Sequence, residues 1–208
     1  MELSISILNS KDKEKTIKIL NNTNISYFHI DIMDGIFVSQ KSLPLEEVQK
    51  ISKLSEKKLD IHLMTINPLK YIEELKKLPN IDSITIHEEL DEDVTPILSK
   101  IKEYGFKRGI SIKPNTDINS LIPYLNDIDK ILIMTVEPGL GGQPFLDSSI
   151  QRIKEIKKLI KDKNILLEVD GGINNNTIKQ LKDVDISVVG SYVTTSNEPI
   201  QKIKDLLV

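Results

Sequence analysis

The chain lacks cysteine and tryptophan altogether, and only two of its 208 residues, Arg108 and Arg152, are arginine. Without cysteine there is no disulfide and no thiolate metal site, so any metal must be held by nitrogen and oxygen atoms. The same absence fits a cytoplasmic protein. With two arginines, a phosphate clamp built from several guanidinium groups is not expected.

Long apolar runs and targeting signals are missing as well. No run approaches the roughly 18 residues of a membrane helix, and the N-terminal Met-Glu-Leu-Ser-Ile-Ser lacks the basic-then-apolar stretch of a signal peptide. The formal net charge is only -3, and the lysines are interleaved with acids, as in Glu-Glu-Leu-Lys-Lys at residues 73–77. We therefore predict solvated helix faces, with neither a membrane nor a nucleic acid as partner.

What the sequence does contain is a regular alternation of short apolar segments and longer amphipathic segments. Its hydrophobic content of 39% over this length is enough for one sizeable core. The apolar segments, each predicted to be a strand, are 3–7, 27–33, 59–64, 84–87, 107–112, 130–136, 165–169 and 184–189. The amphipathic segments, each predicted to be a helix, are 13–20, 45–54, 69–75, 94–101, a short one around 121, 150–160, 178–181 and 200–206.

Eight strand–helix pairs of this kind predict an α/β protein whose parallel strands are buried on both faces. In about 200 residues, with no linker rich in proline, glycine or serine, they favour a single-domain (β/α)₈ TIM barrel over residues 1–208. The rival is an open doubly wound sheet, which normally has a glycine-rich turn after its first strand. Here that turn reads Asn-Ser-Lys-Asp at residues 9–12, which favours the barrel.

All three histidines lie at the C-terminal ends of predicted strands: His29, His62 and His87. A barrel gathers its chemistry at that end of its strands. Because residues i and i+2 of a strand face the same side, His29 shares a face with Asp31. Asp170 closes the seventh strand. We expect two imidazoles and two carboxylates, from His29, Asp31, His62 and Asp170, to converge at the barrel mouth.

Two neutral imidazoles and two carboxylates together carry a charge of -2, which one divalent cation would neutralise. A ligand set of His29, Asp31, His62 and Asp170 suits Zn²⁺ first, and Fe²⁺, Mn²⁺ or Co²⁺ less selectively. For a single isolated histidine, a hydrogen-bonded structural role would be the better interpretation. His87 has no such partner set in the sequence, and we interpret it in that way.

Three of the four methionines lie near the ends of predicted strands: Met33, Met64 and Met134. Methionine is usually core filler. A ring of three at the barrel mouth could instead form an apolar cap over a reacting centre, and both interpretations stay open here.

Glycines follow each of the last three predicted strands. Barrels often bind phosphate there through backbone N–H groups, and glycine lets the backbone approach the anion. The segment 138–144, Pro-Gly-Leu-Gly-Gly-Gln-Pro, also suits a mobile lid. The predicted phosphate-binding positions are Gly139, Leu140, Gly141, Gly142, Gly171, Gly172, Gly190 and Ser191.

Six stretches, in this order, carry a resemblance that spans almost the whole chain. They are Ser-Ile-Leu at 6–8, His-Ile-Asp-Ile-Met-Asp-Gly at 29–35, Asp-Ile-His-Leu-Met at 60–64, Met-Thr-Val-Glu-Pro-Gly-Leu-Gly-Gly-Gln at 134–143, Val-Asp-Gly-Gly-Ile at 169–173 and Gly-Ser at 190–191. With these stretches the chain resembles the ribulose-phosphate 3-epimerases.

The resemblance implies an isomerase that inverts C3 of a ketopentose 5-phosphate, converting D-ribulose 5-phosphate to D-xylulose 5-phosphate. It implies the metal ligand set His29, Asp31, His62 and Asp170, with Asp31 and Asp170 as the acid/base pair. Ser6 and His62 would contact the substrate, and the late glycine loops would hold its phosphate.

Five places depart from the family pattern. Ile5 replaces a common proline, Ile36 a common histidine and Leu140 the usual lid phenylalanine, while residues 39–40 and 192–195 also differ. None of these positions is a proposed metal ligand. They bear on lid behaviour, loop packing and substrate preference, and not on the type of reaction.

Three other functions compete with this one: epimerisation of a hexulose phosphate, decarboxylation, and binding of a sugar phosphate without catalysis. Related enzymes that invert C3 of a hexulose 6-phosphate, such as allulose 6-phosphate, tend to carry Ala at the position of Gly141 and Ser at that of Gly172, so the pentose is favoured. Orotidine-phosphate decarboxylases look for Asp-x-Lys-x-x-Asp, whereas the spacing from Asp60 gives His62 and Thr65. A barrel that only binds sugar phosphate would not need opposed carboxylates.

A homo-oligomer stays open, because small barrels are often oligomers but no patch identifies an interface.

Overall fold

Eight short parallel strands form the centre of the computed structural model, which describes residues 1–207. The strands are β1 (Glu2–Ser6), β2 (Tyr27–Met33), β3 (Lys58–Met64), β4 (Ile81–His87), β5 (Lys107–Ile112), β6 (Lys130–Met134), β7 (Leu166–Asp170) and β8 (Ile186–Val189). The helices are α1 (Lys13–Leu20), α2 (Leu45–Leu54), α3 (Pro68–Leu75), α4 (Thr95–Glu103), α5 (Ser149–Leu159), α6 (Ser191–Thr194) and α7 (Pro199–Leu206), with 3₁₀ turns η1 (Ile118–Tyr124) and η2 (Ile178–Gln180).

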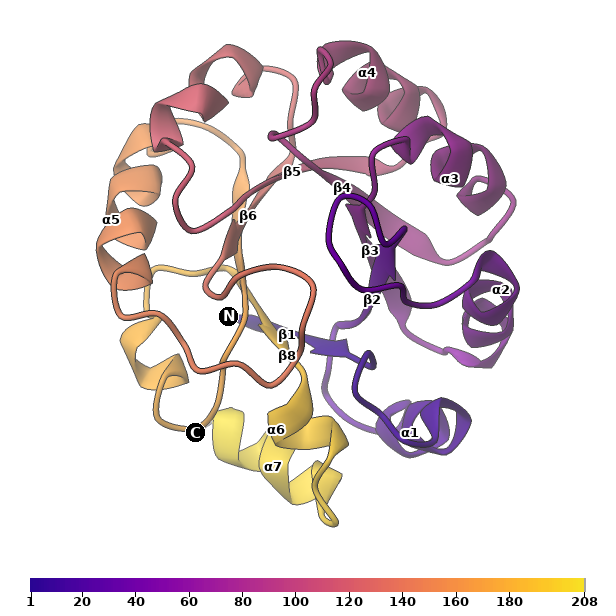
Figure 1. Cartoon of the computed structure of the whole chain (residues 1–208). Helices are drawn as coiled ribbons and strands as arrows, with labels where there is room; N and C mark the ends of the chain where they lie inside the picture. Colours follow the sequence, from indigo (N-terminus) through magenta and orange to yellow (C-terminus); the bar gives the residue numbers. More distant parts are fainter. Residues whose placement is uncertain (208) are drawn as a thin grey trace.

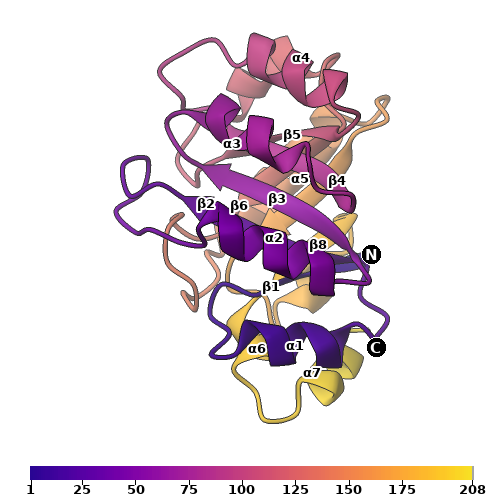
Figure 2. The same ribbon diagram turned by 90° about the vertical axis from the view of Figure 1, so that its right-hand side faces the viewer.

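Each strand pairs in parallel with the next one along the chain, and β8 pairs back onto β1, with Glu2 opposite Ile186. The sheet is therefore a closed barrel. Figure 1 looks along its axis and shows the helices as a ring outside the strands, while Figure 2 shows the strands tilted across the molecule from the side. The predicted (β/α)₈ TIM barrel is confirmed.

The core is a continuous layer of Ile, Leu and Val between the strands and the helix ring. In β2 every residue is buried, as expected for a parallel strand covered on both faces. The helices follow their sequence signals. In α1, Asp12 caps the first turn by accepting from the Lys15 N–H, and Ile17 and Leu20 form its buried face.

Element boundaries differ from the predicted ones by up to three residues, the largest strand difference being at β4, which begins at Ile81 and not at residue 84. The helical segments after β5 and β7 are the 3₁₀ helices η1, which contains Pro123, and η2, which has only three residues. The sixth strand ends at Met134, two residues early, because Thr135 already belongs to the loop above it. The four-residue helix α6 was not predicted, because four residues carry no measurable helical periodicity.

None of the helices within residues 1–207 combines the length and the apolarity that crossing a bilayer requires.

Candidate active site

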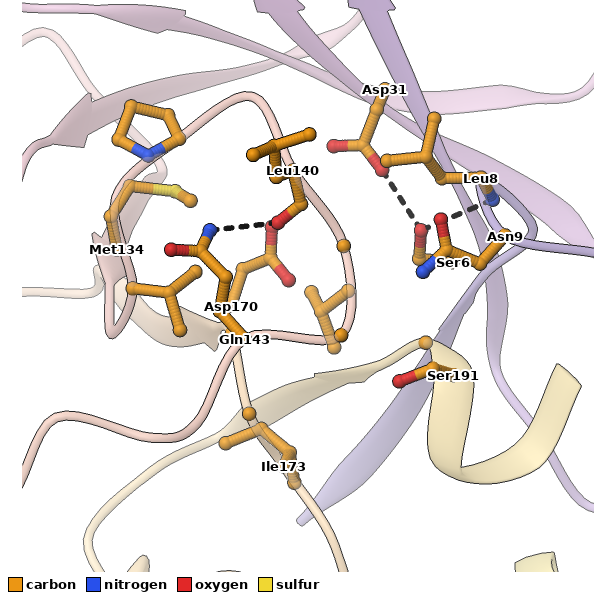
Figure 3. A pocket seen from close by; sticks show the side chains of 18 of the residues that line it. Ser6, Leu8, Asn9, Asp31, Met134, Leu140, Gln143, Asp170, Ile173 and Ser191 are labelled. Carbon is orange, nitrogen blue, oxygen red and sulfur yellow. Dashed lines mark hydrogen bonds between the residues drawn. The ribbon is translucent and has the colours of Figure 1, made fainter. Parts of the chain in front are cut away.

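A cavity of about 400 Å³ opens at the C-terminal end of the barrel. It is lined by the last residues of several strands, among them Ser6 of β1, Met33 of β2 and Asp170 of β7, and by the long loop after β6. Figure 3 shows this loop crossing the cavity, with Asp31 and Ser6 on one side and Met134 on the other. Because the strand ends converge here, side chains far apart in sequence meet at one place.

Four side chains each contribute one potential ligand atom to a group whose members lie within 4.8 Å of one another: His29, Asp31, His62 and Asp170. His29 Nε2 lies 3.4 Å from Asp31 Oδ1 and 3.9 Å from Asp170 Oδ2. His62 Nδ1 lies 3.3 Å from the same Asp31 oxygen, since Asp31 on β2 stands beside His62 on β3. The structure thus brings together the four side chains that the sequence pattern places at the mouth.

The chemistry of this cluster fits a divalent metal ion. His29 Nε2 is buried and has no hydrogen-bond partner among residues 1–207, although it faces two carboxylates. Burial lowers the pKa of His62 to about 4, so its imidazole is neutral, as a metal ligand must be. An orphaned imidazole nitrogen among carboxylate oxygens is what a cation would satisfy. The cluster could therefore hold a metal.

Asp31 and Asp170 have opposite electrostatic surroundings. Burial alone would raise the pKa of Asp31, but His29 and His62 together lower it well below its usual range, and Ser6 Oγ donates to its Oδ2 at 2.8 Å. Burial, reinforced by the charge of Asp31, raises the pKa of Asp170 to about 7. One carboxylate is thus held ionised, whereas the other keeps a proton near neutral pH.

A charged layer lies directly beneath the cluster inside the barrel. His29 Nδ1 lies 2.7 Å from Asp60 Oδ2, and Lys130 Nζ contacts both Asp60 and, at 2.6 Å, Glu168 Oε2. All these side chains are buried. Burial and the charge of Asp60 raise the pKa of Glu168 to about 8. Asp60 therefore accepts from His29 Nδ1, which turns His29 Nε2 toward the cavity.

His62 also contacts His87, which lies outside the cluster of candidate ligands and is hydrogen-bonded, as interpreted from the sequence. His87 Nε2 lies 3.0 Å from His62 Nε2, and His87 Nδ1 lies 2.8 Å from Glu89 Oε2. The His-x-Glu spacing at the end of β4 was a signal that could have revealed this pair. Asp60, Lys130 and Glu168 were also missed, because buried charges on three separate strands share no local sequence pattern.

The three predicted cap methionines all line the cavity, and all are nearly buried. Met33 and Met64 stand side by side on β2 and β3 and pack with Val38, whereas Met134 packs with Leu132 and Val136 on the opposite side. They flank the carboxylates with apolar surface. His29 and His62 do not line the cavity but lie fully buried behind its wall.

The glycines of the late loops allow close packing that side chains would prevent. A Cβ at Gly172, where φ is +69°, would lie 2.2 Å from the Phe145 backbone nitrogen, and one at Gly141 would lie 2.4 Å from Asn9 Nδ2. Asn9, which we had not singled out, thus touches the loop from the β1 side. The remaining predicted phosphate-binding positions, Gly139, Leu140, Gly142, Gly171, Gly190 and Ser191, also line the cavity.

The loop after β6 is exposed at its tip. Leu140 is 58% exposed, and Gln143 braces the loop by donating to the backbone oxygens of Leu140 and Glu137. Figure 3 shows the Gln143–Leu140 bond, with Ser191 at the start of α6 on the other side of the opening. The loop after β6 and the start of α6 thus form this half of the rim.

The closed barrel and the His/Asp cluster at its mouth define a (β/α)₈-barrel protein with a site suited to metal-assisted chemistry. Residues 1–194 match the family model described as the ribulose-phosphate 3 epimerase family. The ribulose-phosphate 3-epimerase of Helicobacter pylori is 34% identical over 202 residues, which cover 95% of this chain and 93% of that protein. That of Bacillus subtilis is 32% identical over 195 residues, covering 91% and 89%. The chain therefore belongs to the ribulose-phosphate 3-epimerase family, whose members are isomerases.

Solved structures of other enzymes share the fold. A mutant tryptophan synthase alpha-subunit from Pyrococcus furiosus matches with a TM-score of 0.74 at 16% identity, covering 99% of this chain and 97% of that one. Orotidine 5'-monophosphate decarboxylase from Methanocaldococcus jannaschii matches with a TM-score of 0.64, also at 16% identity, covering 98% and 96%. At such identities the likeness establishes the barrel alone.

Proposed function

We propose that this chain converts D-ribulose 5-phosphate to D-xylulose 5-phosphate, using one divalent metal ion and two carboxylates that exchange a proton with C3. The observation that carries the proposal is the meeting of Asp31 and Asp170 around His29 and His62 at the mouth of the barrel. Membership of the epimerase family supports the reaction type.

The reaction requires proton transfer on both faces of one carbon. The hydrogen at C3 lies next to the C2 ketone, so its removal leaves an enediolate, and inversion then needs a proton from the opposite face. Asp31 on β2 and Asp170 on β7 come from strands separated by β1 and β8 in the closed sheet, which favours one carboxylate for each face. Each would act as base in one direction and as acid in the other.

The two carboxylates differ in their affinity for protons in the metal-free protein. His29 and His62 outweigh burial and lower the pKa of Asp31, whereas burial raises that of Asp170 to about 7. A divalent ion held by both carboxylates would favour the ionised form of each, so either could then accept the C3 proton. Ser6 fixes the orientation of Asp31 through the hydrogen bond to its Oδ2.

The side chains that would hold the metal are His29, Asp31, His62 and Asp170. Their two nitrogen and two oxygen donors suit Zn²⁺ first, with Fe²⁺, Mn²⁺ and Co²⁺ as alternatives. When bound there, a divalent ion supplies Lewis acidity that stabilises negative charge at the C2 oxygen.

The remaining cavity residues would orient the substrate and exclude water. Backbone N–H groups of the late glycine loops, residues 139–142, 171–172 and 190–191, would bind the phosphate. Met33, Met64 and Met134 would cover the reacting carbon without offering a competing proton.

A hexulose 6-phosphate is the alternative substrate, and two glycines argue against it. The resemblance assigns Ala and Ser to the positions of Gly141 and Gly172 in hexulose enzymes, yet a Cβ at either position would collide with Asn9 or with the Phe145 backbone. The loops of this chain are therefore built around the glycines of the pentose pattern.

The test is conversion of ribulose 5-phosphate by purified protein of measured metal content, with allulose 6-phosphate in parallel. We expect xylulose 5-phosphate to form, activity to disappear on chelation, and Zn²⁺, Mn²⁺, Fe²⁺ or Co²⁺ to restore it. Exchange of the C3 hydrogen in deuterated water separates an enzyme from a barrel that only binds sugar phosphate. Full activity of metal-free protein, or no exchange at C3 in loaded protein, would contradict the proposal.

A further inference from the structure

A hydrogen-bonded chain runs outward from His62 through His87 to Glu89, and the reaction scheme above does not use it. We propose that His87 and Glu89 are positioning residues, which hold the proton of His62 on Nε2 and so keep the lone pair of His62 Nδ1 directed at the carboxylate cluster. This inference rests on the proposed function, because it concerns a ligand of the proposed metal.

The hydrogen bond between His62 and His87 is buried, and the two rings are closely packed. His62 is fully buried and His87 is 1% exposed, so water is not available to either ring. The two ring centroids lie 5.0 Å apart and the ring planes are inclined by 27°, so the rings meet edge to edge through their Nε2 atoms. Phe37 packs against the other side of His87, with ring centroids 4.6 Å apart. Neither imidazole has room to turn over freely.

Glu89 determines which atoms donate in these hydrogen bonds. Its Oε1 accepts from the Lys113 backbone N–H at 2.6 Å and from the Thr116 hydroxyl, which leaves Oε2 facing His87 Nδ1. These contacts, with His87, outweigh burial and lower the pKa of Glu89 to about 2. A carboxylate can only accept hydrogen bonds, so His87 must donate from Nδ1.

The proton positions of the two imidazoles follow from that direction. A neutral imidazole carries one proton, so His87, protonated on Nδ1, has a lone pair on Nε2. The 3.0 Å contact then requires His62 to donate from its own Nε2, which leaves His62 Nδ1 unprotonated. That lone pair faces Asp31 Oδ1 at 3.3 Å, an arrangement that a cation between the two atoms would satisfy.

The hydrogen bonds that hold His29 are separate from those that hold His62. His29 Nδ1 faces Asp60, which is held by Lys130, so neither His87 nor Glu89 takes part. A change at Glu89 should therefore alter His62 and leave the tautomer of His29 as it is. His29 thus serves as an internal reference within the same molecule.

Glu89→Gln is the sharpest test, because it reverses the chain at nearly constant volume. The amide oxygen can still accept from the Lys113 N–H and the Thr116 hydroxyl, so the amide nitrogen faces His87 Nδ1 and donates to it. His87 then donates from Nε2, and His62 must carry its proton on Nδ1. We expect the affinity of the metal-free protein for Zn²⁺ to fall by roughly 10–100-fold, the usual effect of losing such a partner.

Two substitutions at His87 separate positioning from packing. In His87→Gln the amide can still accept from His62 and donate to Glu89, so most of the Zn²⁺ affinity should be kept. His87→Phe preserves the ring against Phe37 but cannot accept from His62, so it should lose affinity as Glu89→Gln does. A role in packing alone predicts the opposite result, with more of the Zn²⁺ affinity kept in His87→Phe than in His87→Gln. Glu88→Gln, in the same loop but outside the hydrogen-bonded chain, is the matched control and should bind Zn²⁺ like the parent.

Zn²⁺ affinity is measured by competition with a fluorescent chelator, and thermal unfolding confirms that each variant is folded. Imidazole nitrogen NMR signals of isotope-labelled histidine report the tautomers directly, and with only three histidines they can be assigned from the variants. His62 unprotonated on Nδ1 in the parent and protonated there in Glu89→Gln supports the inference. An unchanged His62 tautomer with unchanged Zn²⁺ affinity in Glu89→Gln overturns it.

The same experiment distinguishes this inference from the proposed function. If the parent does not bind Zn²⁺ or Mn²⁺, the metal-dependent function fails, while the NMR signals of His62 still decide whether Glu89 sets its tautomer. If the parent binds metal and converts ribulose 5-phosphate, but His87→Phe binds Zn²⁺ as the parent does, the function stands and the positioning role is rejected.

Discussion

The half of the barrel around Asp31 and the half around Asp170 are built differently. Strands β1 to β3 present side chains that are buried and hydrogen-bonded, so Asp31 is 4% exposed and touches Ser6, His29 and His62. Around Asp170, at the end of β7, the wall is glycine backbone and an exposed loop, and its side chain is 17% exposed. The first half fixes an ionised group, and the second leaves room for a ligand.

This difference explains how two identical carboxyl groups reach opposite protonation states. In the metal-free protein the charge of His29 outweighs burial and lowers the pKa of Asp31, whereas burial near another negative charge raises that of Asp170. A site with two symmetric halves would give both groups the same affinity for protons. The asymmetry is therefore a property of the flanking strands and not of the two residues.

Removing either carboxylate is expected to have the largest effect and to separate the two halves. Asp31→Asn and Asp170→Asn should each lower turnover by about 100-fold to 10,000-fold, since each removes a general acid–base group. In deuterated water one variant should still exchange the C3 hydrogen of one epimer, and the other variant that of the opposite epimer. Metal content is measured alongside, because both groups belong to the metal cluster. Retention of more than about a tenth of the activity in either variant contradicts the two-base scheme.

Breaking the charged layer that joins the halves should cost stability. Lys130 on β6 contacts Asp60 on β3 and Glu168 on β7, and Lys130→Met leaves both carboxyl groups without their cation. We expect a loss of about 3–5 kcal/mol in the free energy of unfolding, measured with denaturant. Lys107→Met removes an exposed lysine from Asp82 but leaves Lys58 paired with that carboxylate, so this control should change stability by about 1 kcal/mol or less. Equal losses in the two variants would argue against a structural role for the buried layer.

A glycine comparison tests whether the second half depends on close backbone contact. Gly172 and Gly105 both have positive φ, +69° and +84°, but a Cβ would collide with the Phe145 backbone only at Gly172 and meets nothing within 4 Å at Gly105. Gly172→Ala should therefore destabilise the fold by about 1–3 kcal/mol and raise KM for the sugar phosphate, while Gly105→Ala costs about 1 kcal/mol and leaves KM unchanged. The same KM in both variants would remove Gly172 from the phosphate loop.

The pH dependence of the stability of the metal-free protein should show the two halves separately. This is the smallest of the expected effects. Raised pKa values of about 7 for Asp170 and about 8 for Glu168 contribute stability at low pH that is lost as the pH rises through those values. The lowered pKa values of Asp31 and Asp60 contribute stability that is lost as the pH falls below 3.8.

We therefore expect the melting temperature in chelator to fall by a few degrees between about pH 5 and about pH 8, and Zn²⁺ to raise it more at the higher pH. Asp170→Asn should flatten this fall. A melting temperature that rises over the same range in chelator would show that Asp170 does not carry the raised pKa.

Local sequence patterns were sufficient to predict the eight strands and the cluster of candidate ligands. Period-two alternation places His29 and Asp31 on one face, and strand ends place His62 and Asp170 at the same end of the barrel, so the cluster could be predicted without coordinates. The eight strands followed from apolar runs of the right length, and four elements have the bounds predicted for them: α1, α2, β2 and β5.

Contacts that depend on the angular position of strands around the barrel could not be predicted. Lys130 stands at the start of a strand, where a lysine usually reaches solvent, and its burial depends on Asp60 and Glu168 facing it from other strands. His87 meets His62 because the two side chains turn toward each other across neighbouring strands, which spacing alone does not determine.

The closure of β8 onto β1 bears on how the protein is made. A ribosome delivers β1 to β3 early, with most of the ligand-bearing side chains, but Asp170 arrives on β7 and the ring is shut only when Ile186 reaches Glu2. A nascent chain therefore carries an incomplete set of ligands on an open sheet edge. Such a protein acquires its chemistry in one late event of synthesis, after nearly all of its residues have been added.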